Sequence, residues 1–125
     1  MRALLGSCAV DGGATDEQRT LIQALATGYL GLSLDLDAVE PLGPAGAAAV
    51  FRDHDEKHRL VEVMITLELA RHPASAAQTD LVEQYVAALE VDDQWQSLAR
   101  DYLAGSCELV VADYGRFAEA PRVEP

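Results

Sequence analysis

Apolar residues recur along this chain at intervals of three and four positions, which is the spacing of one face of an α-helix. No segment shows the sustained alternation of apolar and polar residues that is typical of a strand. The pattern predicts helices near residues 1–10, 15–30, 46–51, 53–71, 75–89 and 92–103, with a short irregular segment at 33–42. We therefore expect an all-α protein, a compact bundle of about six to seven helices.

A weak internal repeat organises these helices into pairs. Residues 4–27 align with residues 64–87 at an offset of sixty positions, which places Gln18 on Gln78. Each copy consists of an apolar helix, a small polar loop and a second, capped apolar helix. Two copies of one helical hairpin can bury a core that neither could bury alone. The bundle is therefore expected to be built from two pseudo-repeated hairpins.

Capping signals mark the points at which helices begin. Thr15 with Gln18, and Asp53 with Glu56, have the spacing of a capping box, in which the two residues bond each other's backbone N–H groups. Ser75, three residues before a glutamine, repeats the first of these pairs in the second copy. These positions predict helix starts at three places along the chain.

The chain of 125 residues has the length of one domain. The apolar pattern continues to residue 117, so we expect a single domain over 1–117 and a disordered C-terminal tail over 118–125. No apolar run approaches the ~20 residues that a membrane span requires, and no secretory signal pattern is present. These features predict a cytoplasmic protein without a membrane span.

The formal net charge is −12, from 9 basic and 21 acidic residues. This balance argues against binding to nucleic acid, whose phosphates require lysine and arginine, and against binding to anionic membranes. Basic partners and cations remain as partners of the matching charge. The acidic residues are spread along the chain, so a solvated acidic surface is the plainest interpretation.

The first loop and its flanks resemble the TerB-like domains, a helical family named from tellurite resistance. The run from Ala9 to Arg19 carries the resemblance: an apolar helix leads to Asp-Gly, then to a cap, then to acidic residues that open the next helix. Residues 70–85 occupy the place where such domains repeat the unit. The resemblance covers roughly residues 3–115 and implies an all-helical module with a cation or ligand site at its acidic loops.

Carried over to this chain, the site that the resemblance implies falls on Asp11 and Glu17, with Asp16 beside them. Carboxylates are the hard oxygen ligands that Mg²⁺ and Ca²⁺ prefer, so a divalent cation is the one cofactor that these residues suggest; no other cofactor is expected. Asp16 and Glu17 also suit the first turn of a helix, because the helix dipole favours acids there. The second copy differs, since Arg71-His72 and Ala76-Ala77 stand where further acids would be expected.

His54 and His58 are one helical turn apart, and Glu62 lies one further turn along the same face. Neutral imidazoles at this spacing can bind a transition metal. The cluster supports an alternative hypothesis, a small metal-dependent helical enzyme that uses these three residues. It is also compatible with an exposed, charged first turn of a helix.

Glu68 interrupts an otherwise apolar stretch of the helix predicted at 53–71. A carboxylate at such a position is either paired in the core, for which Arg71 and Arg100 are candidates, or faces a ligand pocket. In both cases burial would raise its pKa.

The two cysteines, Cys8 and Cys107, lie in a Gly-Ser-Cys context on predicted helices. They can be two buried thiols or a disulfide that joins the first and last helices. No nucleophile elbow, phosphate-binding glycine loop or HExxH motif is present. The leading hypothesis is therefore a non-catalytic module that binds a protein partner or a small ligand between its two hairpins. The pattern predicts neither the identity of that ligand nor the oligomeric state.

Overall fold

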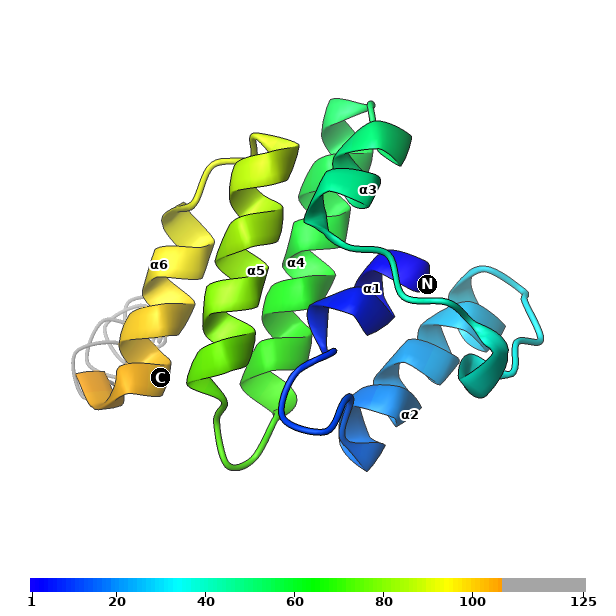
Figure 1. The fold of residues 1–125 in the computed structure, drawn as a ribbon, viewed down its shortest axis with the longest axis horizontal. Coiled ribbons are helices and arrows are strands. Elements are labelled where there is room, and N and C mark those ends of the chain that lie inside the picture. Colours follow the sequence, from blue (N-terminus) through cyan, green and yellow to red (C-terminus); the bar gives the residue numbers. More distant parts are fainter. Residues whose placement is uncertain (107–125) are drawn as a thin grey trace, which may run out of the picture.

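A computed structural model describes residues 1–106, and within this range the chain forms helices and no strand (Figure 1). The prediction of an all-α bundle is confirmed for this part of the chain. The six α-helices are α1 (Arg2–Ser7), α2 (Asp16–Ala24), α3 (Pro44–Val50), α4 (His54–Ala70), α5 (Ala76–Leu89) and α6 (Gln94–Asp101). Between α2 and α3 lie a π-helical turn η1 (Leu25–Tyr29) and a 3₁₀ turn η2 (Leu36–Ala38), and a π-helical turn η3 (Tyr102–Ser106) follows α6.

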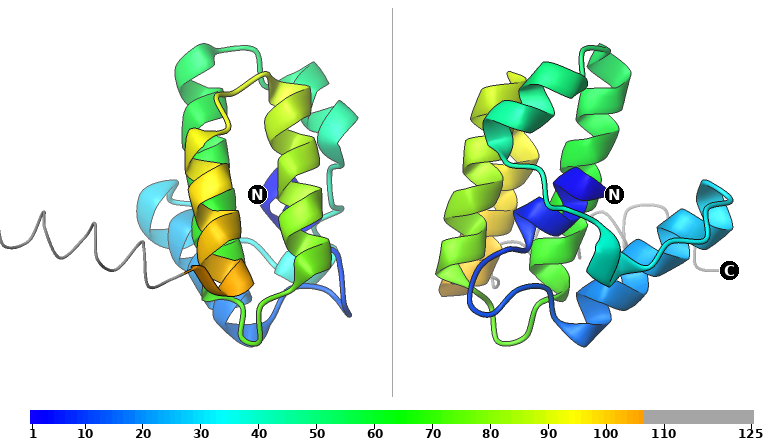
Figure 2. Two further views of the ribbon diagram at one scale, coloured as in Figure 1. Left: turned by 90° about the vertical axis from the view of Figure 1, so that its left-hand side faces the viewer. Right: turned by 45° about the vertical axis from the view of Figure 1, so that its right-hand side comes forward.

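The long helix α4 is the centre of the bundle. Helices α4, α5 and α6 lie side by side, and α1 and α2 lie on the other flank of α4 (Figures 1 and 2). Helix α3 packs on α5. The core is made by apolar side chains from both hairpins, among them Leu4, Ile22, Met64, Leu67, Val82 and Leu89. The predicted boundary at residue 117, the predicted tail at 118–125 and Cys107 lie outside the described residues.

The two copies of the repeat, α1–α2 and α4–α5, meet at the residues that the repeat makes equivalent. The side-chain amide of Gln18 donates to Oε1 of Gln78 at 2.9 Å and to the carbonyl oxygen of Leu67 at 2.8 Å. The amide of Gln78 in turn donates to Sγ of Cys8 at 3.3 Å. All of these groups are buried, so their hydrogen bonds avoid the cost of an unpaired polar group in the core. The hairpins are joined by a polar contact as well as by apolar packing.

The predicted helix starts are found, but the capping boxes differ. At α2 the box is complete, with Gln18 N to Thr15 Oγ1 at 3.2 Å and Thr15 N to Gln18 Oε1 at 2.9 Å. At α5, Ser75 accepts from Gln78 N at 3.1 Å. The Gln78 side chain is turned into the core instead of back to Ser75, because it serves the contact with Gln18. Asp53 likewise caps α4 by accepting from the backbone N–H of Glu56 at 3.1 Å.

Removing either cap should lower the free energy of unfolding. We expect Thr15→Ala to cost about 0.5–2 kcal/mol, the usual loss for an N-cap. Ser75→Ala should lie at the upper end of that range, because the Ser75 hydroxyl also donates to the carboxylate of Asp11. Urea denaturation measures both, with Thr20→Ala as the matched surface control in α2. If neither midpoint moves relative to that control, these hydroxyls do not hold the helix starts.

The two interhelical loops are joined by Arg71, the residue that the repeat aligns with Asp11. Its guanidinium donates to the carbonyl oxygens of Val10, at 3.2 Å, and Gly13. Arg71 is buried, so these bonds satisfy a cation that would otherwise be costly. The second copy of the repeat has Arg71 where the first has Asp11. This difference has a structural reason, because Arg71 connects the first loop to the end of α4 by hydrogen bonds.

A segment that follows η2 crosses α1 at its glycine. The backbone N–H of Leu42 donates to the carbonyl oxygen of Arg2 at 3.0 Å, and the hydroxyl of Tyr85 donates to the carbonyl oxygen of Leu42. Gly6 lies directly under this crossing, where a Cβ would overlap both the Leu42 carbonyl and the Tyr85 hydroxyl. The close approach of the segment to α1 therefore requires a glycine at this position.

Helix α6 is oriented differently from what its apolar residues suggest. Trp95, Leu98 and Tyr102 were expected to form part of its packing stripe, but they are 65 %, 43 % and 45 % exposed. The side chains of α6 that are buried are Gln96 and Ala99. The chain leaves the helical conformation at Gly105, with φ of 97°. The spacing of apolar residues correctly predicted a helix here but not which of its faces is buried. The buried face includes a glutamine, which a hydrophobic pattern does not identify as a core residue.

Candidate ligand-binding groove

An apolar groove of about 470 Å³ lies between the two hairpins, and we call it the hairpin groove. Its volume falls in the range of small-molecule sites, roughly 300–1,000 Å³. One wall comes from the first hairpin and the other from the N-terminal half of α4, with Phe51 between them. The lining residues are Met1, Leu4, Leu25, Tyr29, Leu30, Phe51, Glu56, Arg59, Leu60, Glu62 and Val63.

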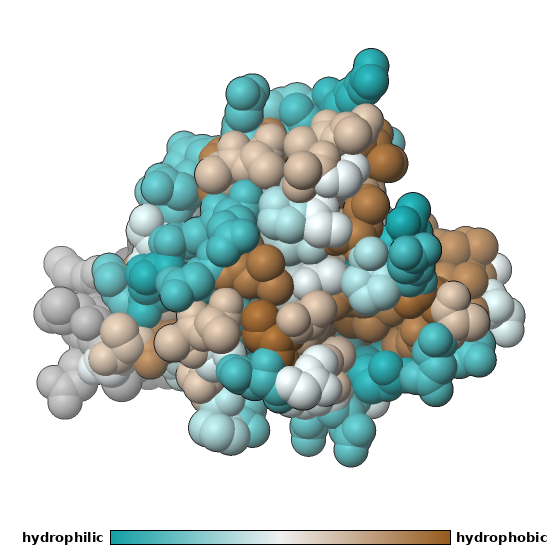
Figure 3. Space-filling model, in the orientation of Figure 1, coloured by the Kyte–Doolittle hydropathy of each residue, from teal (hydrophilic) through white to brown (hydrophobic). Residues whose placement is uncertain are grey.

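The lip of the groove is formed by the π-helical turn η1. The backbone N–H of Leu30 bonds the carbonyl oxygen of Leu25 at 3.1 Å, five residues back, which widens the last turn of the helix. Gly31, with φ of 65°, then reverses the chain. As a result Tyr29 and Leu30 are 79 % and 52 % exposed. Figure 3 shows apolar surface at this end of the molecule.

The floor and the rim of the hairpin groove differ in chemistry. Leu4 and Leu60 form a buried apolar floor. Glu56, Arg59 and Glu62 are exposed and stand at the α4 side of the opening. An apolar wall with a few charged groups at its edge can hold the apolar part of a ligand while the charges orient its polar part.

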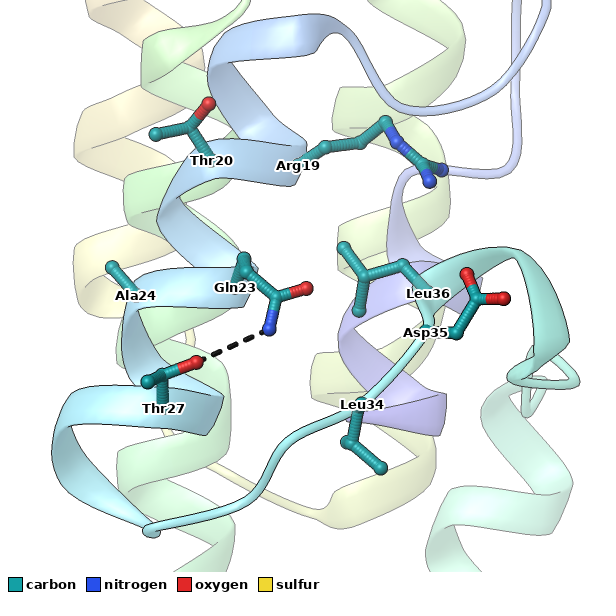
Figure 4. Close-up of a pocket in the computed structure, with 8 residues that line it drawn as sticks. All are labelled: Arg19, Thr20, Gln23, Ala24, Thr27, Leu34, Asp35 and Leu36. Carbon is teal, nitrogen blue, oxygen red and sulfur yellow. Dashed lines mark hydrogen bonds between the residues drawn. The ribbon is translucent and has the colours of Figure 1, made fainter.

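A second hollow, of about 550 Å³, runs along α2 beside residues 34–36 (Figure 4). The guanidinium of Arg19 forms an ion pair with the carboxylate of Asp37 at 2.7 Å. Gln23 donates to the hydroxyl of Thr27 at 3.2 Å, as the dashed line in Figure 4 marks. These polar groups already bond one another, and the hollow is wide open to water. Although it is the larger of the two, we interpret it as solvated surface and place the candidate site at the hairpin groove.

The acids that the family resemblance implies are spread around the first loop. Asp11 adopts a left-handed conformation, with φ of 49°, and its carboxylate accepts from the hydroxyl of Ser75. Asp16 and Glu17 are the exposed first two residues of α2. In residues 1–106 no three His, Cys, Asp or Glu side chains are gathered so that they could hold a metal ion. A divalent cation at Asp11, Asp16 and Glu17 stays a prediction.

The histidine cluster lies at the start of α4. The rings of His54 and His58 are in edge-to-face contact, with centroids 4.3 Å apart. Glu62 follows on the same helix and lines the hairpin groove. The two imidazoles lie together as the spacing predicted. Within residues 1–106, Glu62 does not complete with them a group of three that could hold a metal ion, and the metal-dependent enzyme that would use these three residues stays a prediction.

Glu68 is 2 % exposed and lies away from the hairpin groove. Its Oε2 accepts a hydrogen bond from the amide of Gln96 at 3.3 Å. The partners expected from the sequence are engaged elsewhere: Arg71 at the first loop, and Arg100 with two carboxylates of α5. Burial raises the pKa of Glu68 to about 7, against the hydrogen bond from Gln96 and the charge of Arg100, which lower it. The prediction of a low-dielectric site is confirmed, whereas neither expected arginine is its hydrogen-bond partner.

Cys8 is a buried thiol at the end of α1. Burial raises its pKa, against hydrogen bonds from Ser7 and Gln78 that lower it. A thiol of this kind is protonated at neutral pH and a poor nucleophile.

The hairpin groove itself was not predicted residue by residue. Leu25, Tyr29 and Leu30 continued the helical stripe of α2 in the sequence, which suggested packing. The glycines at 28 and 31 were the one available signal that this helix ends irregularly. The spacing of apolar residues does not predict a π-helical turn at the end of a helix. The extra residue in that turn does not change the spacing in the helix that precedes it.

No family model, curated protein or solved structure matches this chain. Among the helices of residues 1–106, none combines the length and the apolar character that crossing a membrane would require.

Proposed function

We propose that this protein is a small, acidic, non-catalytic helical module that binds the apolar part of a small ligand or of a protein partner in the hairpin groove. The observation that carries the proposal is the groove itself: an apolar volume between two hairpins, with large apolar side chains left exposed at its lip. Exposed apolar residues of this kind, when they are gathered and rimmed by charge, are typical of binding surfaces.

Membership of the TerB-like family and a cytoplasmic location belong to the same proposal. The Asp-Gly loop with its capped, acid-opened helix, and the hairpin repeat, support the first of these. The net charge of −12 favours a neutral or basic binding partner over nucleic acid.

The proposal is tested with Nile red, a neutral apolar dye whose fluorescence reports binding to apolar sites. We expect the wild type to bind it in the native state and Leu30→Asp to weaken binding about tenfold or more. Losing the burial of one leucine side chain is worth about 1.5–3 kcal/mol, and each 1.4 kcal/mol is a factor of ten.

Val50→Asp is the matched control, because Val50 is also exposed and apolar (62 %) but lies on α3, outside the groove. It should bind the dye as the wild type does. Equal binding by all three proteins, or loss in the control alone, would reject the hairpin groove as the site.

A further inference from the structure

Helix α6 contacts the bundle through a buried polar side chain as well as through Ala99. A surface helix normally packs through its apolar stripe. Here that stripe faces outward, and the buried side chains are those of Gln96 and Ala99, 1 % and 5 % exposed. The attachment of α6 therefore depends strongly on what Gln96 bonds.

Gln96 bridges two helices. Its side-chain amide donates to Oε2 of Glu68 on α4 at 3.3 Å and to the backbone carbonyl of Thr79 on α5 at 3.2 Å. Within residues 1–106, two buried acceptors of the same pair have no hydrogen-bond partner: Oε1 of Glu68 and Oε1 of Gln96. An ionised carboxylate and an amide oxygen are both acceptors, so neither can satisfy the other.

Protonation of the Glu68 carboxyl would provide the missing hydrogen-bond donor. A neutral Glu68 carries an O–H group, which can donate to the amide oxygen of Gln96 while the amide N–H₂ donates back. The pair then has two hydrogen bonds in place of one bond and two orphaned oxygens. We propose that Glu68 is protonated when α6 is docked, and that this acid–amide pair is a pH-sensitive latch: α6 loosens when Glu68 gives up its proton.

Burial favours the protonated form of Glu68, whereas the charges around it act in opposite directions. Burial raises its pKa to about 7, Arg100 of α6 lowers it, and Glu83 of α5 raises it. The Arg100 guanidinium is already shared by Asp80, at 2.9 Å, and Glu83, at 2.6 Å. The charged groups that shift the pKa of Glu68 include none from α1 or α2.

On its own helix, α4, the nearest cation at the C-terminal end is Arg71. Its guanidinium is directed to the carbonyl oxygens of Val10 and Gly13 instead. Arg71 therefore gives no hydrogen bond to an ionised Glu68.

The direction in which pH changes the docking of α6 follows from the pKa of Glu68 in the docked and undocked states. In an undocked α6 the carboxyl meets water and its pKa returns toward 4.5, whereas in the docked state it is about 7. Docking therefore takes up a proton, and the equilibrium constant for undocking rises about tenfold per pH unit between these values, then levels off. The total change is on the order of 300-fold.

The latch also adjoins the proposed binding site. Trp95 of α6 and Glu62 of α4 line one cavity of about 110 Å³, and Glu62 also stands on the rim of the hairpin groove. Loosening of α6 therefore changes the packing beside that rim.

Amide hydrogen exchange followed by NMR tests the latch. Protection factors, corrected for the intrinsic pH dependence of exchange, should fall for α6 amides between pH 5 and 7 and stay flat for the middle of α5. In Glu68→Gln, whose side-chain amide can pair with Gln96 at any pH, α6 protection should not depend on pH. Protection of α6 that falls equally in both proteins would overturn the proposal.

A second measurement does not depend on the variant. The ¹³C resonance of the Glu68 carboxyl in the wild-type protein should titrate with a midpoint near 7, the pH at which the loss of α6 protection levels off. A midpoint near 4.5 would overturn the latch, because Glu68 would then be ionised while α6 is docked. A midpoint near 7 without any change in α6 would also overturn it, because the proton would then not control docking.

Discussion

Replacing Gly6 by alanine should lower the free energy of unfolding by about 3 kcal/mol, at the upper end of the usual cost of overpacking a core. The added Cβ would overlap the Leu42 carbonyl oxygen and the Tyr85 hydroxyl. The first of these is backbone, so it cannot move aside by changing a rotamer. Either the crossing segment lifts off α1 or the Tyr85 hydrogen bond to Leu42 is lost.

Chemical denaturation of Gly6→Ala measures this cost, with Gly28→Ala as the control. A Cβ at Gly28 meets no other atom within 4 Å, and alanine in a helical turn is favoured over glycine by about 0.5–1 kcal/mol. The control should therefore be as stable as the wild type or more stable. A Gly6→Ala protein that unfolds at the wild-type midpoint would show that the segment at Leu42 does not lie on α1.

Replacing Glu68 by glutamine should stabilise the protein at pH 8 by about 3 kcal/mol, an order-of-magnitude conversion of the pKa shift. Burial raises the folded-state pKa of Glu68 from 4.5 to about 7. A carboxyl whose pKa is raised by folding contributes its stability in full below 4.5 and loses it as the pH rises through 7. The glutamine has no proton to lose, so it keeps the favourable pairing at every pH.

The stability difference between Glu68→Gln and the wild type should therefore be small at pH 4, grow between pH 5 and 7, and be constant above that. Urea denaturation at several pH values gives this curve, and other titrating groups cancel in the difference. Glu62→Gln, an exposed glutamate on the same helix, serves as the control and should show no such rise. A flat curve for Glu68→Gln would mean that this carboxyl is ionised in the folded protein.

The sequence predicted well those features that depend on neighbouring residues. Thr15 and Gln18 form the expected capping box, because a cap is a contact over three positions. The helices end close to where glycine and proline predicted, and the phase of α4 correctly placed Glu68 in the interior. The repeat predicted that two hairpins share a core.

Features that depend on how the hairpins approach each other were not predicted. The repeat aligned Gln18 with Gln78, but their direct hydrogen bond depends on a near-symmetric docking that one-dimensional spacing does not specify. The same holds for Gln96, whose partner lies 28 residues away on α4. The outward orientation of Trp95 follows from that polar contact, since burying Gln96 turns the apolar face of α6 to water.

The hairpin groove is another consequence of docking. Its walls come from α1, η1 and α4, and its lip from a π-helical turn. Among the candidate site residues of the sequence analysis, Glu62 lines this groove, and it was named there as a metal ligand. The candidate residues have varied surroundings: His54 and His58 touch, Glu62 reaches the groove rim, and Asp11 bonds Ser75.

The central proposal is that an apolar ligand binds in the hairpin groove. Amide chemical-shift mapping during a Nile red titration tests this most directly. We expect the largest shifts at residues 1–4, 25–30 and 56–63, which form the groove, and their loss in Leu30→Asp. Shifts confined to residues 19–24 and 34–36, which line the hollow along α2, or to α6, would show that the ligand does not bind in the hairpin groove.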